Sequence, residues 1–414
     1  MGISAFRTAI FAGFVACTAL VSWMPVPAAL AESFEESVLV PAGPASVEPG
    51  QISRQITPED SSWDSIVPGA APAAATPDIS GAPLQDPLQA DDACIEELRR
   101  CCCCPNWTHY AIFDFLFLQR NNQAGNQPLV LDGADVPVIT VQSLQPSIGT
   151  GFRVFYGELI TDSIGWEIGY LGIYGMFGQA TAASPLNLNA PTPLGIAVNN
   201  FNDADTARAT YWSSLNMAEM NVFCYDCCEE CGPTRCRLTN CRRSCHCVDW
   251  LAGFVWAGLN EQASLTMDCC NPPEPATYTV NTATNYFGGQ IGQRGRREWQ
   301  RWAVEGWWKT ALCGTNAFQS GAPIQGSLAT EPERGAVSSS TTGVGFIGNL
   351  NGTLIYKLTQ QWGLRAGYNA IWLTNAALAP TQFDFNTAVG AGTGINANGV
   401  VFLHGVNLGL ERRW

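Results

Sequence analysis

The chain has 414 residues, of which 41 are Gly and 14% are charged, and it contains 14 Trp, 10 Tyr and 19 Phe. Such a Gly-rich, aromatic-rich and weakly charged composition is not that of a helical protein. The formal net charge is −14, so the chain lacks the basic footprint that binding to nucleic acid requires.

Residues 1–31 have the layout of a secretory signal peptide. Arg7 precedes an apolar run over residues 8–23, and Ala29-Leu30-Ala31 places small residues where a signal peptidase cleaves. The run approaches the length of a helical anchor, but two prolines and the cleavage motif favour its removal. No later stretch reaches about 18 uncharged apolar residues. A membrane location of the mature chain therefore requires a β-barrel.

Residues 32–93 form an acidic, Pro/Ala-rich tail with eleven acids and a single base, Arg54. The tail has few aromatics and no sustained periodicity, which predicts disorder. A Cys-rich segment, residues 94–106, follows it. The acidity of the chain therefore belongs mainly to the tail.

Residues 107–414 predict an all-β fold, an antiparallel transmembrane barrel of ten strands. The predicted strands are 107–119, 150–160, 165–179, 208–223, 248–264, 283–294, 297–312, 341–357, 362–373 and 400–414. Long and short connections mostly alternate, as in outer-membrane barrels with tight periplasmic turns and long outer loops. The exception is 224–247, a long Cys-rich connection on the predicted periplasmic side. Val136 to Leu144 is a candidate extra strand, which would need a partner and would raise the count to twelve.

The last strand shows the pattern most clearly. Phe402, Val406, Leu408, Leu410 and Trp414 share one face, and polar residues occupy the other. This pattern is typical of a transmembrane barrel strand, which has one face toward lipid and an aromatic residue at the membrane interface. The alternative is the edge strand of a soluble sandwich. His404 falls on the lipid face and would need an interfacial position or a neighbour.

The opposite faces of the strands carry charges that we expect to line the barrel interior. These residues are Asp114, Glu167, Glu219, Arg301, Glu305, Lys309, Lys357, Arg365, Glu411 and Arg413. Acids and bases balance in this set. One interpretation is a lumen that selects solutes, and the other is a filling of salt bridges, because small barrels are packed by side chains.

Several segments resemble the planctomycete putative beta-barrel porin family. They are Phe113-Asp114-Phe115-Leu116-Phe117-Leu118-Gln119-Arg120, Gly165-Trp166-Glu167-Ile168-Gly169-Tyr170, Trp250-Leu251-Ala252-Gly253-Phe254, Leu259-Asn260-Glu261-Gln262 and Gly367-Tyr368-Asn369-Ala370-Ile371-Trp372-Leu373. The resemblance covers about 107–414 and consists of strand patterns, with no catalytic signature. It implies an outer-membrane barrel with porin-like transport, but it gives no role to the cysteines.

Sixteen of the 17 cysteines lie beyond the signal peptide. In an oxidising envelope, disulfides are the expected state of such residues. The candidates are Cys94, Cys101, Cys102, Cys103, Cys104, Cys224, Cys227, Cys228, Cys231, Cys236, Cys241, Cys245, Cys247, Cys269, Cys270 and Cys313. Bridges from 94–104 to 224–247, or to a second copy of the chain, are both open. Zinc at Cys224, Cys227, Cys228, Cys231 and the later Cys245-His246-Cys247 is the alternative, although we predict no metal and no cofactor.

The sequence indicates no enzyme, because it contains no nucleophile-elbow, phosphate-loop or zinc-protease motif. Two functions remain. The first is a porin-like channel for small solutes in the bacterial outer membrane. The second is a disulfide-cross-linked structural or surface barrel without an open pore. In both, the expected partners are outer-membrane lipid, the barrel assembly machinery and, through disulfides, further copies of the chain.

Overall fold

The computed structural model describes residues 107–414 except 123, 162–163, 226–245, 270–273 and 325–331. The predicted signal peptide, the acidic tail, the segment 94–106 and most of the Cys-rich connection lie outside the described residues. Those assignments therefore stay predictions.

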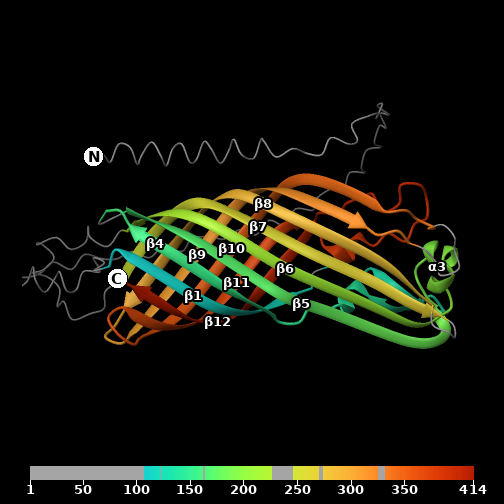
Figure 1. Cartoon of the computed structure of the whole chain (residues 1–414), viewed down its shortest axis with the longest axis horizontal. Coiled ribbons are helices and arrows are strands. Elements are labelled where there is room, and N and C mark those ends of the chain that lie inside the picture. The colour runs from blue at the N-terminus through green and yellow to red at the C-terminus, as the bar shows by residue number, and fades with distance from the viewer. Residues whose placement is uncertain (1–106, 123, 162–163, 226–245, 270–273, 325–331) are drawn as a thin grey trace, which may run out of the picture. The chain divides into compact units, whose positions relative to one another are not determined.

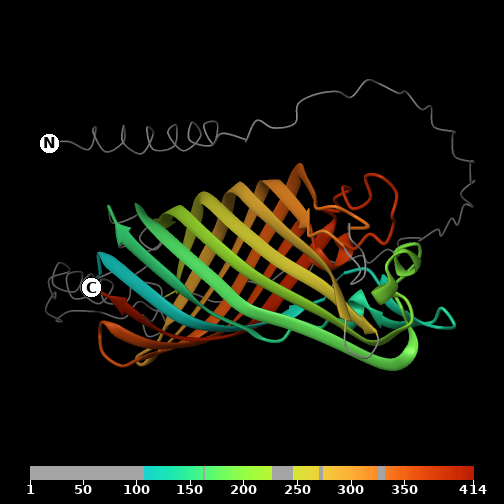
Figure 2. The ribbon, with the colours of Figure 1, turned by 45° about the vertical axis from the view of Figure 1, so that its right-hand side comes forward.

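Ten long strands form a closed antiparallel barrel in the described part of the chain (Figures 1 and 2). They are β1 His109–Asn121, β4 Gly149–Leu159, β5 Ile164–Asn189, β6 Ala204–Tyr225, β7 His246–Cys269, β8 Glu274–Glu298, β9 Trp302–Gly321, β10 Val337–Lys357, β11 Trp362–Ala376 and β12 Gly399–Arg413. Each strand pairs with its neighbours in this order, and β1 pairs with β12 to close the ring. The all-β barrel prediction and the count of ten strands are confirmed.

The two ends of the barrel differ. Short turns join β4 to β5, β8 to β9 and β10 to β11 at one end, which we call the turn end. The first and last strands also meet there, where the amides of Thr108 and His109 donate to the carbonyl of Trp414 at 2.8 and 2.9 Å. The opposite end, called the loop end, carries four longer connections, β1–β4, β5–β6, β9–β10 and β11–β12, and the small helix α3 Leu194–Ala197 (Figure 1). The connection of β7 to β8 at this end has four residues, shorter than predicted.

Two further strands lie in the connection between β1 and β4. β2 Pro128–Asp132 pairs with β3 Pro137–Thr140, and Leu131 and Asp132 of β2 pair with the end of β5. β3 covers only the first part of the candidate extra strand at 136–144, because residues 141–143 form the 3-10 helix η1, and β2 is its partner. The hairpin extends the sheet at the loop end and takes no place in the ring of ten.

One predicted turn was misplaced. The predicted strands 283–294 and 297–312 leave a turn at 295–296. In the structure Gly295 lies within β8 and pairs with Val248 and Gly306, and the turn comes at 299–301. Arg296 and Glu298 therefore belong to a strand.

Strand faces follow the predicted alternation. On β12 the even-numbered residues face outward, and on β1 Phe113, Phe115 and Phe117 are 39%, 56% and 42% exposed. On β7, where apolar residues occur at both odd and even positions, the structure shows that Phe254 faces outward and Val255 faces inward. His404 faces outward, and its Nδ1 lies 2.6 Å from the Tyr368 hydroxyl. Through the middle of the barrel the outer face of these strands is thus mainly apolar, and most of their charged side chains face inward.

The apolar exterior does not extend to the loop end. There the outward faces of β7 and β8 carry hydroxyl pairs, with Ser264 and Thr279 2.9 Å apart and Thr266 and Thr277 3.1 Å apart. Water is the natural solvent of such a surface. An apolar band toward the turn end and a polar rim at the loop end divide the outer surface.

Two apolar clusters fill the ends of the interior. Trp107, Tyr110, Phe223, Leu251 and Trp307 belong to the smaller cluster, toward the turn end. A much larger cluster reaches from mid-barrel to the loop end and includes residues of the connections. The charged residues of the interior therefore have apolar packing on both sides.

Candidate functional site in the barrel interior

Ion pairs, most of them buried, occupy the barrel interior, and we call the whole set the network. They form three groups that are not joined to one another by an ion pair among the described residues. In the described part of the chain its ion pairs join eight acids and eight bases, so its formal charge is zero. The acids are Asp114, Glu167, Glu219, Asp249, Glu261, Glu298, Glu305 and Glu411; the bases are Arg120, Arg153, Arg294, Arg296, Lys309, Lys357, Arg365 and Arg413. Such pairing is what burial of charge requires.

Arg365 on β11 is the hub of the mid-barrel part. Its guanidinium lies 3.3 Å from Asp114 Oδ1, 3.0 Å from Glu305 Oε1 and 2.7 Å from Glu411 Oε2. Asp114 also pairs with Arg153 of β4. These contacts connect β1, β4, β9, β11 and β12 through the interior, in addition to the backbone ladder.

A second hub is Glu167 on β5. It pairs with Lys309 Nζ at 3.0 Å and with Arg294 Nη1 at 3.1 Å, and it accepts a hydrogen bond from the Tyr110 hydroxyl. Lys309 also contacts Glu219 at 3.0 Å. Strands on opposite parts of the ring are therefore joined across the interior.

Toward the turn end the network continues through Arg296. Its guanidinium pairs with Glu411 at 2.7 Å, with Glu305 at 3.1 Å and with Glu298 at 2.6 Å. Glu298 in turn pairs with Lys357 at 2.5 Å and is 37% exposed. The network thus begins in partial contact with water and becomes fully buried within the barrel.

A separate ion pair lies nearer the loop end. Arg120 Nη1 is 2.5 Å from both Glu261 Oε1 and the Ser213 hydroxyl. The other carboxylate oxygen of Glu261 accepts the backbone amide of Ala379 at 2.9 Å. Ala379 begins η3 Ala379–Gln382, in the connection between β11 and β12. This pair therefore fixes a loop-end connection to the inside of the barrel.

On the loop-end side of Arg365, asparagine side-chain amides form a series of hydrogen bonds across β10, β11 and β12. Asn351 Nδ2 donates to Asn369 Oδ1 at 2.7 Å, and Asn369 Nδ2 donates to Asn407 Oδ1 at 2.8 Å. Arg153 Nη1 also donates to Asn369 Oδ1, at 2.7 Å. The amides extend the polar network without adding charge.

At mid-barrel these side chains touch almost no water. The side chains of Asp114 and Arg365 are 0% exposed and that of Arg153 is 1% exposed. Residues that line an open aqueous channel would be reached by water along its length. The interior at this level is packed by ion pairs, as expected where few strands enclose it.

The structure places nine of the ten residues predicted to line a pore in or beside this network. Arg301 is the exception, because it lies exposed in the turn between β8 and β9 and not on a strand. Its assignment to the interior was wrong, for the same reason that the turn was misplaced.

Sequence reasoning missed seven members of the network. They are Arg120, Arg153, Asp249, Glu261, Arg294, Arg296 and Glu298. Arg120 lies one residue beyond the predicted end of its strand, on the same face as Asp114. Continuing the alternation past the predicted boundaries would have found it.

Three predicted disulfide cysteines have described side chains. Cys224 is exposed and Cys313 is buried, and both are free thiols. Cys313 faces the interior on β9. Neither thiol is bonded to another described cysteine, and the predicted disulfides to cysteines outside the described residues stay a prediction. Cys269 Sγ accepts a hydrogen bond from Asn200 Nδ2 at 3.6 Å. The other thirteen candidates lie among residues or side chains that the structure does not describe.

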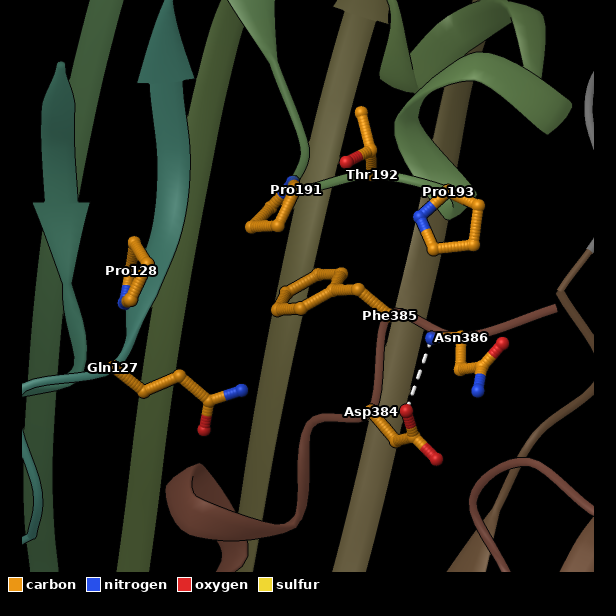
Figure 3. Close-up of a pocket in the computed structure, with 8 residues that line it drawn as sticks. All are labelled: Gln127, Pro128, Pro191, Thr192, Pro193, Asp384, Phe385 and Asn386. Atoms are coloured by element: carbon orange, nitrogen blue, oxygen red, sulfur yellow. Dashed lines mark hydrogen bonds between the residues drawn. The ribbon is translucent and has the colours of Figure 1, made fainter. Parts of the chain in front are cut away.

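The loop end also has a shallow pocket of about 530 Å³ (Figure 3). Its walls come from Gln127, Pro128, Pro191, Thr192, Pro193, Asp384, Phe385 and Asn386. The Asp384 carboxylate is engaged by its own loop, accepting the amides of Asn386 at 2.9 Å and Gly392 at 2.7 Å. Among the described residues there is no group of three metal-ligating side chains.

The sequence model of the family described as Putative beta barrel porin-7 (BBP7) matches residues 120–414. The chain belongs to this family. The match covers β2 to β12 and the last residues of β1, and it confirms the barrel porin resemblance read from the strand patterns. No curated protein matches the chain.

Solved structures give only distant likenesses. The outer membrane protease OmpT from Escherichia coli is 9% identical with a TM-score of 0.38, over 74% of this chain and 97% of that one. A Pseudomonas aeruginosa FadL homologue is 6% identical with a TM-score of 0.22, covering 74% and 90%. The CymD monoaromatic hydrocarbon channel is 8% identical with a TM-score of 0.24, covering 74% and 88%. These values carry no argument about function.

A search of the described residues finds no helix with the length and apolar character to cross a membrane.

Proposed function

We propose that this member of the porin-7 family is an outer-membrane barrel that serves as a structural or surface element of the cell envelope and has no open pore at rest. The proposal of a closed barrel rests on the burial of Asp114, Arg153 and Arg365 at mid-barrel. The apolar band on the outer surface supports embedding in lipid, and the family supports the outer membrane. Cross-linking of copies through cysteines outside the described residues belongs to the same proposal.

The energetics favour a closed interior. Separating the pairs around Arg365 would leave several charges unpaired in a poorly hydrated space, and breaking a buried pair costs roughly 3–5 kcal/mol. A pore through this level would need several such separations at once. We therefore expect the closed form to dominate.

Planar-bilayer recording tests the proposal. The full chain, purified with its native thiol state, should insert without producing steady conductance. The double variant Asp114→Ala with Arg153→Ala removes one cation and one anion and should introduce measurable channels. An exterior control, Gln262→Ala, should stay silent. Steady, ohmic channels from the wild-type protein would overturn the closed-barrel proposal.

A porin-like channel for small solutes is the second candidate, and the family description favours it. In that function the ion-pair network would act as a filter that must rearrange to pass a solute. Swelling of liposomes in small sugars distinguishes the two, because only a channel lets the sugar enter. We propose no enzymatic activity. The histidines with described side chains, His109 and His404, lie on the outer face, each beside a tyrosine hydroxyl.

A further inference from the structure

An arginine lies between two tryptophans on the outer surface at the turn end. The guanidinium carbon of Arg412 is 5.4 Å from the ring centre of Trp362 and 4.9 Å from that of Trp414. The two indoles are 41% and 38% exposed, and Arg412 is exposed as well. His109 extends the aromatic surface by stacking on Trp414, with ring centres 5.7 Å apart.

Arg412 has no acidic partner within the described part of the chain. Its neighbours on β12 face inward, where Glu411 pairs with Arg365 and Arg413 pairs with Glu305. Glu158, an outward acid at this end among the described residues, lies on β4, with β1 between it and β12. A cation that borders an apolar surface without a counter-ion is a site for an anion from outside the chain.

The surface next to Arg412 is an apolar column. Leu410, Leu408 and Val406 follow it on the outer face of β12 and are 42%, 54% and 47% exposed, and Leu364 beside them on β11 is 46% exposed. Six residues of strand span about 20 Å. One leaflet of the hydrocarbon core is about 15 Å thick. That length runs from Arg412 to Val406, whereas the apolar column itself, Leu410 to Val406, spans about 13 Å and so covers most of an acyl chain.

We propose that this surface, Trp362, Arg412 and Trp414 with the column beside them, binds an anionic phospholipid of the leaflet at the turn end. The lipid phosphate takes the guanidinium, whose planar donors match phosphate oxygens. The indoles flank it at the depth of the headgroups, where tryptophan is favoured. The site rests on the proposed membrane location of the barrel, because the acyl chains need the apolar band.

Native mass spectrometry of the full chain tests the site. The protein is held in mild detergent with equal amounts of phosphatidylglycerol and phosphatidylcholine, and the retained lipid is counted for each variant. Wild-type protein should retain phosphatidylglycerol preferentially. Arg412→Gln should lower that retention about fivefold, as about 1 kcal/mol per cation at an anionic surface implies. Trp362→Leu should lower it less.

The matched control is Arg208→Gln. Arg208 is an exposed base on β6 near the loop end, bonded to Gln179 Oε1 at 2.8 Å, and its loss should leave lipid retention unchanged. Faster migration of unheated samples on gels checks that each variant is a folded barrel. Equal retention by Arg412→Gln and wild type, or displacement of the lipid by inorganic phosphate, would overturn the site. Open channels in bilayers would remove the closed-barrel proposal and leave this site intact.

Discussion

Arg365 shows why single residues matter in this barrel. Its guanidinium contacts three carboxylates and has 0% exposed surface. Two bases, Arg296 and Arg413, share two of these acids. Each acid therefore depends on more than one base, and the network tolerates burial because no charge is left alone.

Replacing Arg365 with Met should lower the free energy of unfolding by about 3–5 kcal/mol, since the acids around it lose a buried partner. Arg365→Lys should lose less, because it keeps the charge but not the fork geometry. Unfolding by urea in detergent measures both. The deficit of the Met variant should shrink in acid, where protonation neutralises the surplus carboxylates.

Arg208→Met is the control for loss of a cation. This exposed side chain should change stability by less than about 0.5 kcal/mol. An Arg365→Met protein as stable as wild type would show that the mid-barrel pairs do not hold the strands together.

At the scale of elements, the seam between β1 and β12 closes the barrel. Gly409 on β12 pairs with Asp114 on β1, and a Cβ there would collide with the Phe113 carbonyl oxygen and the Asp114 carboxylate. The Asp114 Cα would lie only 2.7 Å away. The close approach of the two strands thus depends on a residue without a side chain.

Gly409→Ala should therefore weaken the seam, at a cost of about 1–3 kcal/mol for overpacking. The folded fraction, read from the mobility of unheated samples on gels, should fall after refolding. Gly352→Ala is the matched control, because a Cβ at Gly352 meets nothing within 4 Å. Equal refolding of the two variants would contradict the prediction.

Hydrogen bonds between side chains and the backbone hold the connection between β11 and β12 in place. Glu261 accepts the Ala379 amide, and the Thr284 hydroxyl accepts the Ala377 amide at 3.1 Å. Farther along, the Gln382 side chain exchanges two hydrogen bonds with the backbone of Asn396, at 2.7 and 2.8 Å. A strand residue thus orders the start of a long loop-end connection.

Glu261→Ala should accelerate proteolytic cleavage within 377–398 by about tenfold, because hydrogen bonds to charged groups contribute about 1.5–3 kcal/mol. Cleavage sites and rates come from peptide mapping. Gln262→Ala, one residue along β7 on the outer face, should be cleaved at the wild-type rate. If cleavage of the Glu261 variant were unchanged, the connection would be held by its own contacts.

At the scale of the whole molecule, every strand pairing of the ring lies between residues 109 and 413. Deletion of 32–104 should therefore leave a barrel that refolds and migrates like the full chain when unheated. A barrel that fails without this segment would favour the predicted bridges from 94–104 to 224–247. Non-reducing peptide mapping of the full chain tests those bridges directly.

Much of the fold could be predicted from the sequence because the alternation of residues along a barrel strand shows which side chains face outward and which face inward. Trp362, Leu364 and Tyr368 face outward and Arg365 and Asn369 face inward, as the alternation predicts. The boundaries were less accessible. Gly295 has the chemistry of a turn residue, and only its pairing with Val248 and Gly306 shows that β8 continues.

The candidate site was accessible only in part. The alternation predicted that Asp114, Glu305 and Arg365 share the interior, but it gave no distances between strands remote in sequence. Whether opposed charges meet or stand apart across water depends on the barrel radius. The sequence therefore left both a selective lumen and a salt-bridged filling open.

The residue pattern of 107–414 is sufficient to predict an outward-apolar, inward-polar barrel of ten strands, since each strand encodes its two faces with a period of two. What fills the interior follows only from the closed ring. Closing ten strands into a ring brings Arg365 within reach of Asp114, Glu305 and Glu411 from three other strands. Because contact between opposite charges is a property of the closed ring and of no single strand, the filled interior could be read only from the fold.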